Sequence, residues 1–220
     1  MPAAVIFDLD GVLIDTEGLQ YEAYARVLCD FGVSVTLEEY ARQWIAAGQG
    51  PEYAVRTYRL PVDAAKLRAL KNPVYHDILR RHARLVPGAI EALTRLHDGF
   101  ALGVATNSNR TDVSFVMDHF GLRRFFRSII TREDYVRPKP NPDAYLAAAA
   151  GLEVPPGACV VVEDAHKGIV AAHRAGAVAV AVPNIYTREN DFSLAAAVLG
   201  SLDELTVALV ETLLTAREVR

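Results

Sequence analysis

The sequence is poor in cysteine: its 220 residues include only two, Cys29 and Cys159. They stand far apart, without the close spacing of a zinc site or a redox pair. A disulfide-stapled fold and a metal centre built on paired cysteines are therefore excluded. Cys29 falls on a helical pattern and Cys159 opens an apolar run, so we expect both thiols to be buried.

Long apolar segments and runs of basic residues are also missing. The N-terminal stretch has no charged start and reaches its first acid at Asp8, which argues against a signal peptide and a membrane-spanning segment. Lysine and arginine number 23 against 27 aspartates and glutamates, a formal net charge of −4. Without a basic stripe, this balance gives no basis for binding nucleic acid. We expect a cytoplasmic monomer that binds a small phosphorylated molecule and neither nucleic acid nor membrane.

What is present is typical of a soluble globular protein, with 51% hydrophobic and 23% charged residues. Several apolar runs lack the alternation of a half-exposed strand and are predicted to be buried parallel strands. They cover residues 4–7, 101–105, 159–162 and 178–182, with a weaker candidate at 128–131. Helical patterns occupy residues 87–97, 108–120, 143–150 and 167–175. The alternation predicts an α/β fold: a doubly wound parallel sheet, Rossmann-like, with helices on both faces.

Residues 16–84 interrupt this alternation with helical patterns and no convincing strand. Leu19, Ala23 and Val27 lie on one face of a first helix. The segment 36–39 is a capping box that starts a second. An all-helical insert after the first strand is interpreted as a small cap over the strand ends. We therefore assign residues 16–84 to a helical cap domain, and the catalytic core to residues 1–15 and 85–220.

Two further helix boundaries are predicted. Residues 63–83 supply a third helical region of the insert, which we expect to break at Pro73. A C-terminal helix is expected to begin at the capping box from Ser201 to Glu204 and to cover one edge of the core.

Polar side chains follow the predicted strands. Ligands of doubly wound folds bind outside the carboxyl ends of the strands. The groups found there are Asp8, Asp10, Thr106, Asn107, Ser108, Lys139, Glu163 and Asp164. Each of them alone has an ordinary structural interpretation, as a turn, a helix cap or a surface charge. Their occurrence in order at successive strand ends is what indicates a site.

These residue types suit phosphoryl transfer. Clustered carboxylates are the oxygen ligands that Mg2+ prefers. An aspartate can attack a phosphate and form an aspartyl-phosphate, which divides one hard step into two, and a second acid two residues on can protonate the leaving oxygen and then activate water. Thr106 and Lys139 can neutralise the phosphate oxygens. The sequence therefore predicts a magnesium-dependent phosphoryl-transfer enzyme with Asp8 as nucleophile.

Four segments resemble the ordered motifs of the haloacid-dehalogenase-like (HAD) hydrolase superfamily. They are residues 7–17, 105–108, 139–143 and 162–176. The helical insert resembles the small cap that follows the first motif of this family. Within the superfamily, the chain looks like the branch that contains β-phosphoglucomutase and several sugar-phosphate and phosphoglycolate phosphatases.

Carried over to this sequence, the resemblance implies particular roles. Asp8 would be the nucleophile and Asp10 the general acid and base. The phosphate site would consist of Thr106, the backbone amide of Asn107, and Lys139. Mg2+ would be held by Asp8, Asp10 (through its backbone carbonyl), Glu163 and Asp164.

The reaction within this family stays open between two interpretations. A phosphatase acting on a small metabolite, such as a sugar phosphate, is the first. A β-phosphoglucomutase-type mutase is the alternative, because Lys71 and Asn72 match a pair in mutase caps. Gln20, however, stands where mutases carry a histidine, and the loop 48–51 lacks their arginine. An uncharged loop grips a second phosphate poorly, which favours the phosphatase.

Three other activities fit less well. A phosphonatase needs a cap lysine of depressed pKa, and nothing around Lys66 or Lys71 indicates one. A haloacid dehalogenase needs no acid at Asp10, because its leaving halide takes no proton. A receiver domain that accepts phosphate without turnover would carry its acceptor on a later strand and would have no cap.

Overall fold

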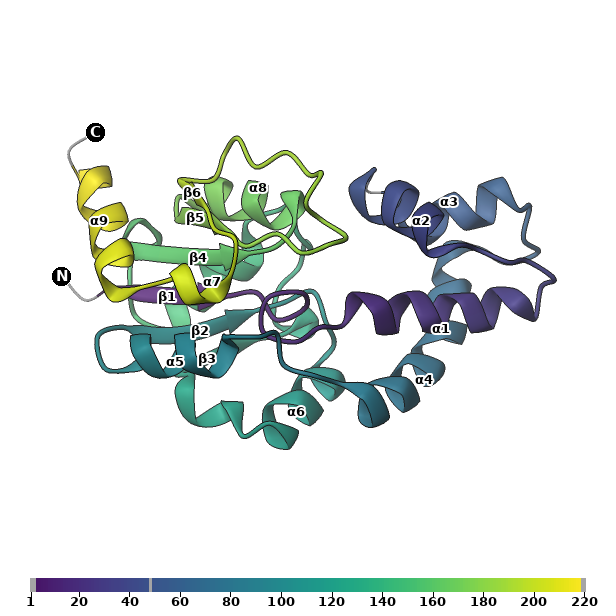
Figure 1. Ribbon diagram of the computed structural model, residues 1–220, viewed down its shortest axis with the longest axis horizontal. Helices are drawn as coiled ribbons and strands as arrows, with labels where there is room; N and C mark the ends of the chain where they lie inside the picture. The colour runs from purple at the N-terminus through teal and green to yellow at the C-terminus, as the bar shows by residue number, and fades with distance from the viewer. Residues whose placement is uncertain (1–2, 48, 219–220) are drawn as a thin grey trace. The chain divides into compact units, whose positions relative to one another are not determined.

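A parallel sheet forms the framework of the fold. A computed structural model describes residues 3–47 and 49–218 of the chain. Within them, six strands pair in the order β3-β2-β1-β4-β5-β6, and every neighbouring pair is parallel (Figure 1). The doubly wound α/β fold expected from the alternating pattern is confirmed.

The strands fall on the predicted apolar runs, with one addition. They are β1 (Ala4–Phe7), β2 (Ala101–Ala105), β3 (Ser128–Ile130), β4 (Cys159–Glu163), β5 (Val178–Ala181) and β6 (Ala197–Val198). The sequence analysis does not predict β6, because this edge strand takes only two residues of the apolar stretch 194–199 and its Val198 is exposed.

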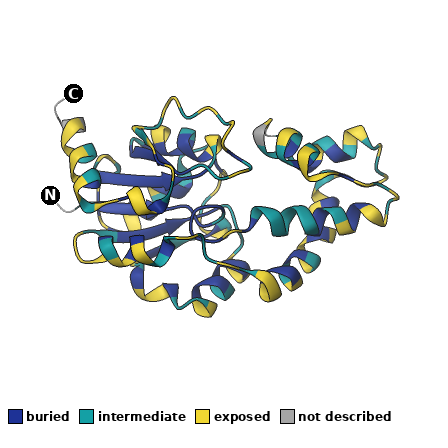
Figure 2. Cartoon of the chain, in the orientation of Figure 1, coloured by how far each residue is buried: buried dark blue, intermediate teal, exposed yellow. Residues whose placement is uncertain are grey.

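Strand β1 shows why the runs are apolar without alternation. All four of its residues are completely buried. Ala4 and Ile6 belong to the core cluster that includes residues of α7 (Asp143–Gly151) and α8 (His166–Ala175). Since successive side chains of a strand point to opposite faces, Val5 and Phe7 are buried on the other side. The sheet is therefore covered on both faces, as the dark strands of Figure 2 show.

The remaining helices around the sheet are short. They are α5 (Ala89–His97), α6 (Arg110–His119) and α9 (Val207–Glu218), with 3-10 turns at Leu122–Phe125, Arg132–Asp134, Pro156–Ala158 and Leu202–Glu204. Helix α5 packs against β2, and α9 against β4. Asn109 caps α6: its Oδ1 accepts a hydrogen bond from the Asp112 N–H at 2.9 Å.

The chain divides into two compact units. The first comprises Met1–Ile14, Leu85–Asn184 and Asn190–Arg220, and contains the sheet. The second comprises Asp15–Arg84 and Ile185–Glu189. The helical insert therefore clusters with a short segment that follows β5, far from it in the sequence.

The second unit is helical and has a core of its own. Its helices are α1 (Glu17–Cys29), α2 (Leu37–Glu39), a π-helix (Tyr40–Ala46), α3 (Gly50–Thr57) and α4 (Ala64–His82). Helix α1 packs against α4, and the core includes Leu28, Trp44 and Leu67. The Thr36 side chain accepts from the Glu39 N–H at 3.1 Å, as the capping box predicts.

The predicted break at Pro73 is wrong, because α4 continues through that residue. A proline inside a helix costs about 3 kcal/mol, since it removes one hydrogen bond and crowds the preceding turn. The turns on both sides bury Leu67, Tyr75, Ile78 and Leu79. Burial of a side chain of this size contributes about 1.5–3 kcal/mol, so the packing outweighs the proline.

The predicted start of the C-terminal helix is also wrong. The Ser201 hydroxyl accepts from the Asp203 N–H, but it caps only the 3-10 turn. Leu205 then leaves the helical conformation with its side chain completely buried. Thr206 caps α9 instead, by accepting from the Leu209 N–H at 3.2 Å.

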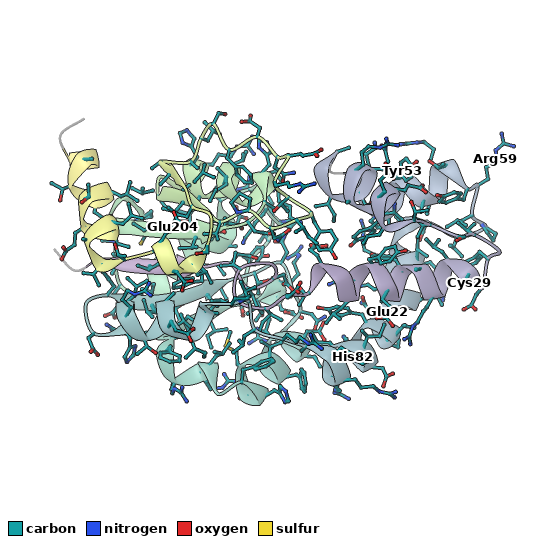
Figure 3. All side chains as sticks on the ribbon, viewed as in Figure 1. Glu22, Cys29, Tyr53, Arg59, His82 and Glu204 are labelled. Carbon is teal, nitrogen blue, oxygen red and sulfur yellow. The ribbon has the colours of Figure 1, made fainter. Side chains whose placement is uncertain are left out.

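The two cysteines differ in burial. Cys159 is buried as expected, but Cys29 is exposed at the end of α1, which corrects the expectation of a buried thiol (Figure 3). Among the described residues, no helix has the length and apolar character needed to cross a membrane.

Two leucines give a matched test of the packing. Leu93 on α5 is 0% exposed and Leu146 on α7 is 41% exposed. Leu93→Ala leaves a cavity and should lower the free energy of unfolding by about 2–5 kcal/mol, whereas Leu146→Ala should cost less than about 1 kcal/mol. Urea denaturation of both variants checks this. Equal losses would contradict the packing of α5.

Candidate active site

The site lies where the strand order reverses. Strand β1 is flanked by β2 and β4, and ligands of open α/β sheets bind at such a switch point. Asp8 follows β1 directly, and its N–H donates to the Val162 carbonyl of β4 at 2.9 Å. Glu163 is the last residue of β4, with Asp164 next. The parallel register thus brings these acids to one edge.

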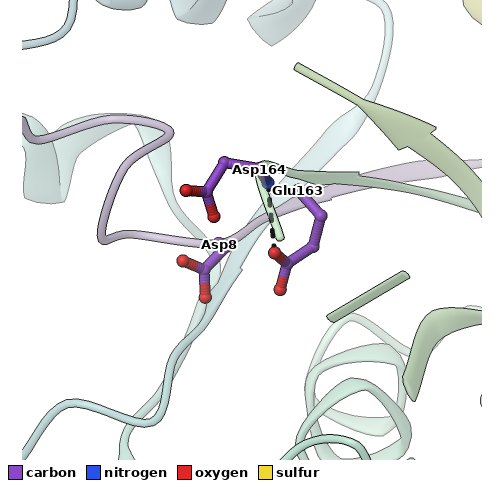
Figure 4. A group of neighbouring side chains, drawn as sticks. All are labelled: Asp8, Glu163 and Asp164. Carbon is purple, nitrogen blue, oxygen red and sulfur yellow. Dashed lines mark hydrogen bonds between the residues drawn. The ribbon is translucent and has the colours of Figure 1, made fainter. Parts of the chain in front are cut away.

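Three buried carboxylates meet at this edge. Asp8, Glu163 and Asp164 each offer an oxygen, and these atoms all lie within 4.8 Å of one another (Figure 4). We refer to them as the acidic cluster. The Asp164 N–H donates to Glu163 Oε2 at 3.1 Å, which fixes the turn after β4.

Lys139 is the cation beside the acidic cluster. It is buried, and its Nζ donates to Asp8 Oδ1 at 2.5 Å and to Glu163 Oε1 at 2.7 Å. The Ala105 carbonyl and Tyr145 hydroxyl oxygens also lie 2.8 Å from this Nζ, whose three N–H groups are shared among the four acceptors. Lys139 therefore joins the ends of β1, β2 and β4.

Burial and charge shift the pKa values of these groups. Burial raises the pKa of Asp8 to about 7, helped by Glu163 and opposed by Lys139. Burial alone would lower the pKa of Lys139, but the carboxylates of Asp8 and Glu163 hold it above its ordinary value. Burial and Glu163 raise the pKa of Tyr145, so its protonated hydroxyl donates to Glu163 Oε1 at 2.6 Å.

Asp10 is held by residues that follow β2. Its Oδ2 accepts from the Ser108 hydroxyl at 2.6 Å and from the Thr106 hydroxyl at 3.1 Å. Thr106 Oγ1 also accepts from the Ser108 N–H at 3.0 Å. The structure thus directs the Thr106 hydroxyl at Asp10.

The Asn107 side chain organises the loop that carries Lys139. Its Oδ1 accepts from the Tyr135 hydroxyl at 2.6 Å and from the Lys139 N–H at 3.2 Å. The Thr106 carbonyl oxygen lies 2.9 Å from the same hydroxyl, whose single proton is shared between the two acceptors. Asn107 Oδ1 is therefore engaged within the protein, and the backbone amide of Asn107 remains the group predicted to contact phosphate.

Two glycines leave room for the acids. A Cβ on Gly11, whose φ is +80°, would lie 2.3 Å from Asp164 Oδ2. A Cβ on Gly168 would lie 1.8 Å from Glu163 Oε1. Both distances are too short for any side chain, so the Gly11 turn and the start of α8 approach the acidic cluster only because these positions are glycine.

The acidic cluster fits a divalent metal. Three buried carboxylates face one ammonium group, and buried charge is costly unless it is paired. Their donor atoms are oxygens, the ligands that Mg2+ takes. Asp8, Glu163 and Asp164 are therefore the side chains able to hold such an ion.

Sequence reasoning gave no role to three residues of this site. Ser108 is among the polar groups expected after the strands, but the sequence does not indicate its contact with Asp10. Tyr145 fits the sequence pattern of a core residue in a helix, and nothing in the surrounding sequence indicates its contact with Glu163. Asn184 donates from Nδ2 to Asp164 Oδ2 at 2.7 Å. It lies shortly after β5. The rule that ligands bind outside the carboxyl ends of the strands could therefore have identified it.

The residues weighed for a mutase lie in the second unit. Lys71 is buried, and its Nζ donates to Gln20 Oε1 at 2.7 Å. The same Nζ lies 4.5 Å from the centre of the Tyr75 ring and 5.3 Å from that of Tyr24. In the loop 48–51, Gly48 lies outside the described residues.

With this geometry in hand, comparison with known proteins defines the class of enzyme. The model of the haloacid dehalogenase-like hydrolase family matches residues 5–182. The chain belongs to this family and is a hydrolase, as the four motifs indicate.

Curated relatives and solved structures agree with this assignment. A putative phosphatase, YhcW, of Bacillus subtilis is 32% identical over 213 residues, 96% of either chain. The fructose-1-phosphate phosphatase YqaB of Escherichia coli is 30% identical over 82% of this chain and 96% of its own. The chain spans 54% of the length of a bifunctional riboflavin kinase/FMN phosphatase of Arabidopsis thaliana. The crystal structure of CbbY from Rhodobacter sphaeroides in complex with phosphate is 29% identical, with a TM-score of 0.81 over 96% of this chain and 100% of that one.

The raised pKa of Asp8 makes stability depend on pH. In metal-free protein the folded state keeps the Asp8 proton up to about pH 7, whereas the unfolded chain releases it near about pH 4. Raising the pH across this range favours the unfolded chain. The free energy of unfolding of the wild type should fall relative to Asp8→Asn, by at most about 1.4 kcal/mol per pH unit.

Urea denaturation with a chelator, at intervals from about pH 4 to pH 8, checks this. Asp98→Asn, at an exposed position, serves as the control and should follow the wild type. Parallel curves for the wild type and Asp8→Asn would contradict the raised pKa.

Proposed function

We propose that the chain is a magnesium-dependent phosphatase that hydrolyses a small phosphorylated metabolite, such as a sugar phosphate. The observation that carries this proposal is the acidic cluster at the strand ends, with Lys139 in contact with Asp8. The named phosphatases among the relatives support phosphomonoester hydrolysis, and the phosphate complex of CbbY supports an anion site in this fold.

The proposed reaction has two steps. In the first, an Asp8 carboxylate oxygen bonds to phosphorus while the bond from phosphorus to the leaving oxygen breaks, and Asp10 gives its proton to that oxygen. In the second, Asp10 takes a proton from water, whose oxygen bonds to phosphorus as the bond to Asp8 breaks. The products are the alcohol and inorganic phosphate.

The protein contacts support these roles. Hydrogen bonds from Thr106 and Ser108 orient the Asp10 carboxylate two residues from the nucleophile. A phosphoryl group on Asp8 would lie beside the Lys139 ammonium, which neutralises developing charge. Bound Mg2+ would supply further positive charge, and Asp8, Glu163 and Asp164 would hold it, with the Asp10 backbone carbonyl as the fourth protein ligand.

The helical unit is proposed to act as the cap that selects the substrate. It has its own core and is inserted directly after the loop that carries the nucleophile. Such an insert can exclude water and contact the leaving group while the core performs the chemistry. We place residues 16–84 in this role, now together with Ile185–Glu189.

A mutase is the second candidate. Lys71 favours it, because a buried ammonium is the kind of group that binds a second phosphate. Its contact with Gln20 and two tyrosine rings engages it within the helical unit, which weighs against this role.

Phosphate release from a metabolite panel tests the proposal. The panel contains sugar phosphates, phosphoglycolate, nucleotides and β-glucose 1-phosphate, with Mg2+ or with a chelator. We expect release that requires Mg2+ and that Asp8→Asn lowers by at least about 10³-fold. Asp10→Asn should lower it by about 10²–10⁴-fold, the usual contribution of a general acid and base.

Asp98→Asn is the matched control and should retain the wild-type rate, because Asp98 is exposed at the end of α5. Conversion of β-glucose 1-phosphate to glucose 6-phosphate without release would favour the mutase. Release that persists with chelator or in Asp8→Asn would contradict the proposed mechanism.

A further inference from the structure

Asn184 connects the acidic cluster to the segment after β5. Its Nδ2 donates to Asp164 Oδ2 at 2.7 Å, and Asp164 is buried. A Cβ on Gly11 would lie 2.3 Å from that oxygen and 3.0 Å from Asn184 Nδ2. The turn after β1 therefore packs against both partners of this hydrogen bond.

The neutral amide affects Asp164 differently from the way Lys139 affects the other two acids. Lys139 pairs its charge with Asp8 and Glu163. Asn184 orients the Asp164 carboxylate without neutralising it, which preserves negative charge for a cation. Outer partners of this kind typically alter metal affinity by about 10–100-fold.

Asn184 also begins a connecting segment, residues 184–191, which we call the strap. At its far end, Asn190 Oδ1 accepts from the His166 N–H at the start of α8, at 3.0 Å. The carbonyl of Asp191 lies 2.7 Å from His166 Nδ1. Both ends of the strap are thus bonded within the first unit, close to Asp164.

The middle of the strap, Ile185–Glu189, clusters with the helical unit. Within that unit the Tyr186 hydroxyl lies beside α1: a Cβ on Gly18 would be 3.2 Å from it. Burial, together with the charges of Asp15 and Glu17, raises the pKa of this tyrosine. The strap is therefore anchored in the helical unit by a half-buried aromatic side chain.

We propose that Asn184 is a positioning residue for the Asp164 carboxylate and that the strap couples the metal affinity of the acidic cluster to the helical unit. The inference rests on the proposed function, because it takes Asp164 as a metal ligand. A change in the helical unit that shifts Tyr186 would move Asn184, two residues earlier, and with it the donor that orients Asp164.

Binding of Mn2+, which takes the same octahedral oxygen coordination as Mg2+, tests the inference on the full chain. Asn184→Leu keeps the approximate size and removes the donor. Its Kd for Mn2+, measured by calorimetry or electron paramagnetic resonance, should rise by about 10–100-fold. Tm without metal is measured in parallel to separate metal affinity from folding.

Asn109→Leu is the matched control. Asn109 Nδ2 also donates to an aspartate, Asp112 Oδ2, at 2.7 Å, but away from the acidic cluster. This variant should lower the metal-free Tm and leave the Kd for Mn2+ within about twofold of the wild type. If Asn184→Leu behaved in the same way, its role would be structural only and the positioning role would be overturned.

Tyr186→Ala tests the coupling, with Tyr58→Ala as control in the same unit. Tyr58 bonds to Glu39, outside the strap. We expect Tyr186→Ala to raise the Kd for Mn2+ about fivefold or more, and Tyr58→Ala to leave it unchanged. An unchanged Kd in Tyr186→Ala would overturn the coupling.

The outcomes also separate this inference from the proposed function. Absence of Mn2+ binding by the wild type, or unaltered binding by Asp164→Asn, would overturn both. Mn2+ binding that Asn184→Leu weakens, in a protein that releases no phosphate, would support the inference and overturn the phosphatase.

Discussion

The rest of the site depends on one constraint: three buried carboxylates share the site with one buried lysine. Asp8, Glu163 and Asp164 would repel one another in a water-poor environment, and Lys139 compensates only part of that charge. Burial, helped by Glu163 and Asp10, raises the pKa of Asp8. The excess of negative charge favours binding of a divalent cation. Asp8, whose raised pKa weakens the metal-free fold, is thus the same residue that we propose as the phosphoryl acceptor once a cation is bound.

The parallel sheet supplies the rigidity that this arrangement needs. Strand β1 is buried on both faces and paired on both sides, so Asp8 has little freedom to retreat from Glu163. The approach of neighbouring segments depends on glycine at positions 11 and 168, where any Cβ would collide with a carboxylate. Tertiary packing, rather than the conformational propensity of each segment, therefore determines where the side chains of the site lie.

Prediction from the sequence was accurate where one local signal decided the outcome. The apolar runs located the main strands, and the polar residues after them located the acids, because parallel strands end at a common edge. It was wrong where tertiary contacts compete with a local signal. Helix α4 passes through Pro73 because the turns around it are buried, and α9 begins after Leu205 because that side chain enters the core.

By itself, the sequence determined the class of fold, the order of the motifs and the residues available for catalysis, because each depends on residue type and spacing along the chain. The tertiary structure decided which of these groups touch: that Thr106 and Ser108 hold Asp10, that Tyr145 bridges Lys139 and Glu163, and that Asn184 orients Asp164. Such contacts join segments far apart in sequence. Their geometry follows from strand order and side-chain packing, which no local pattern encodes.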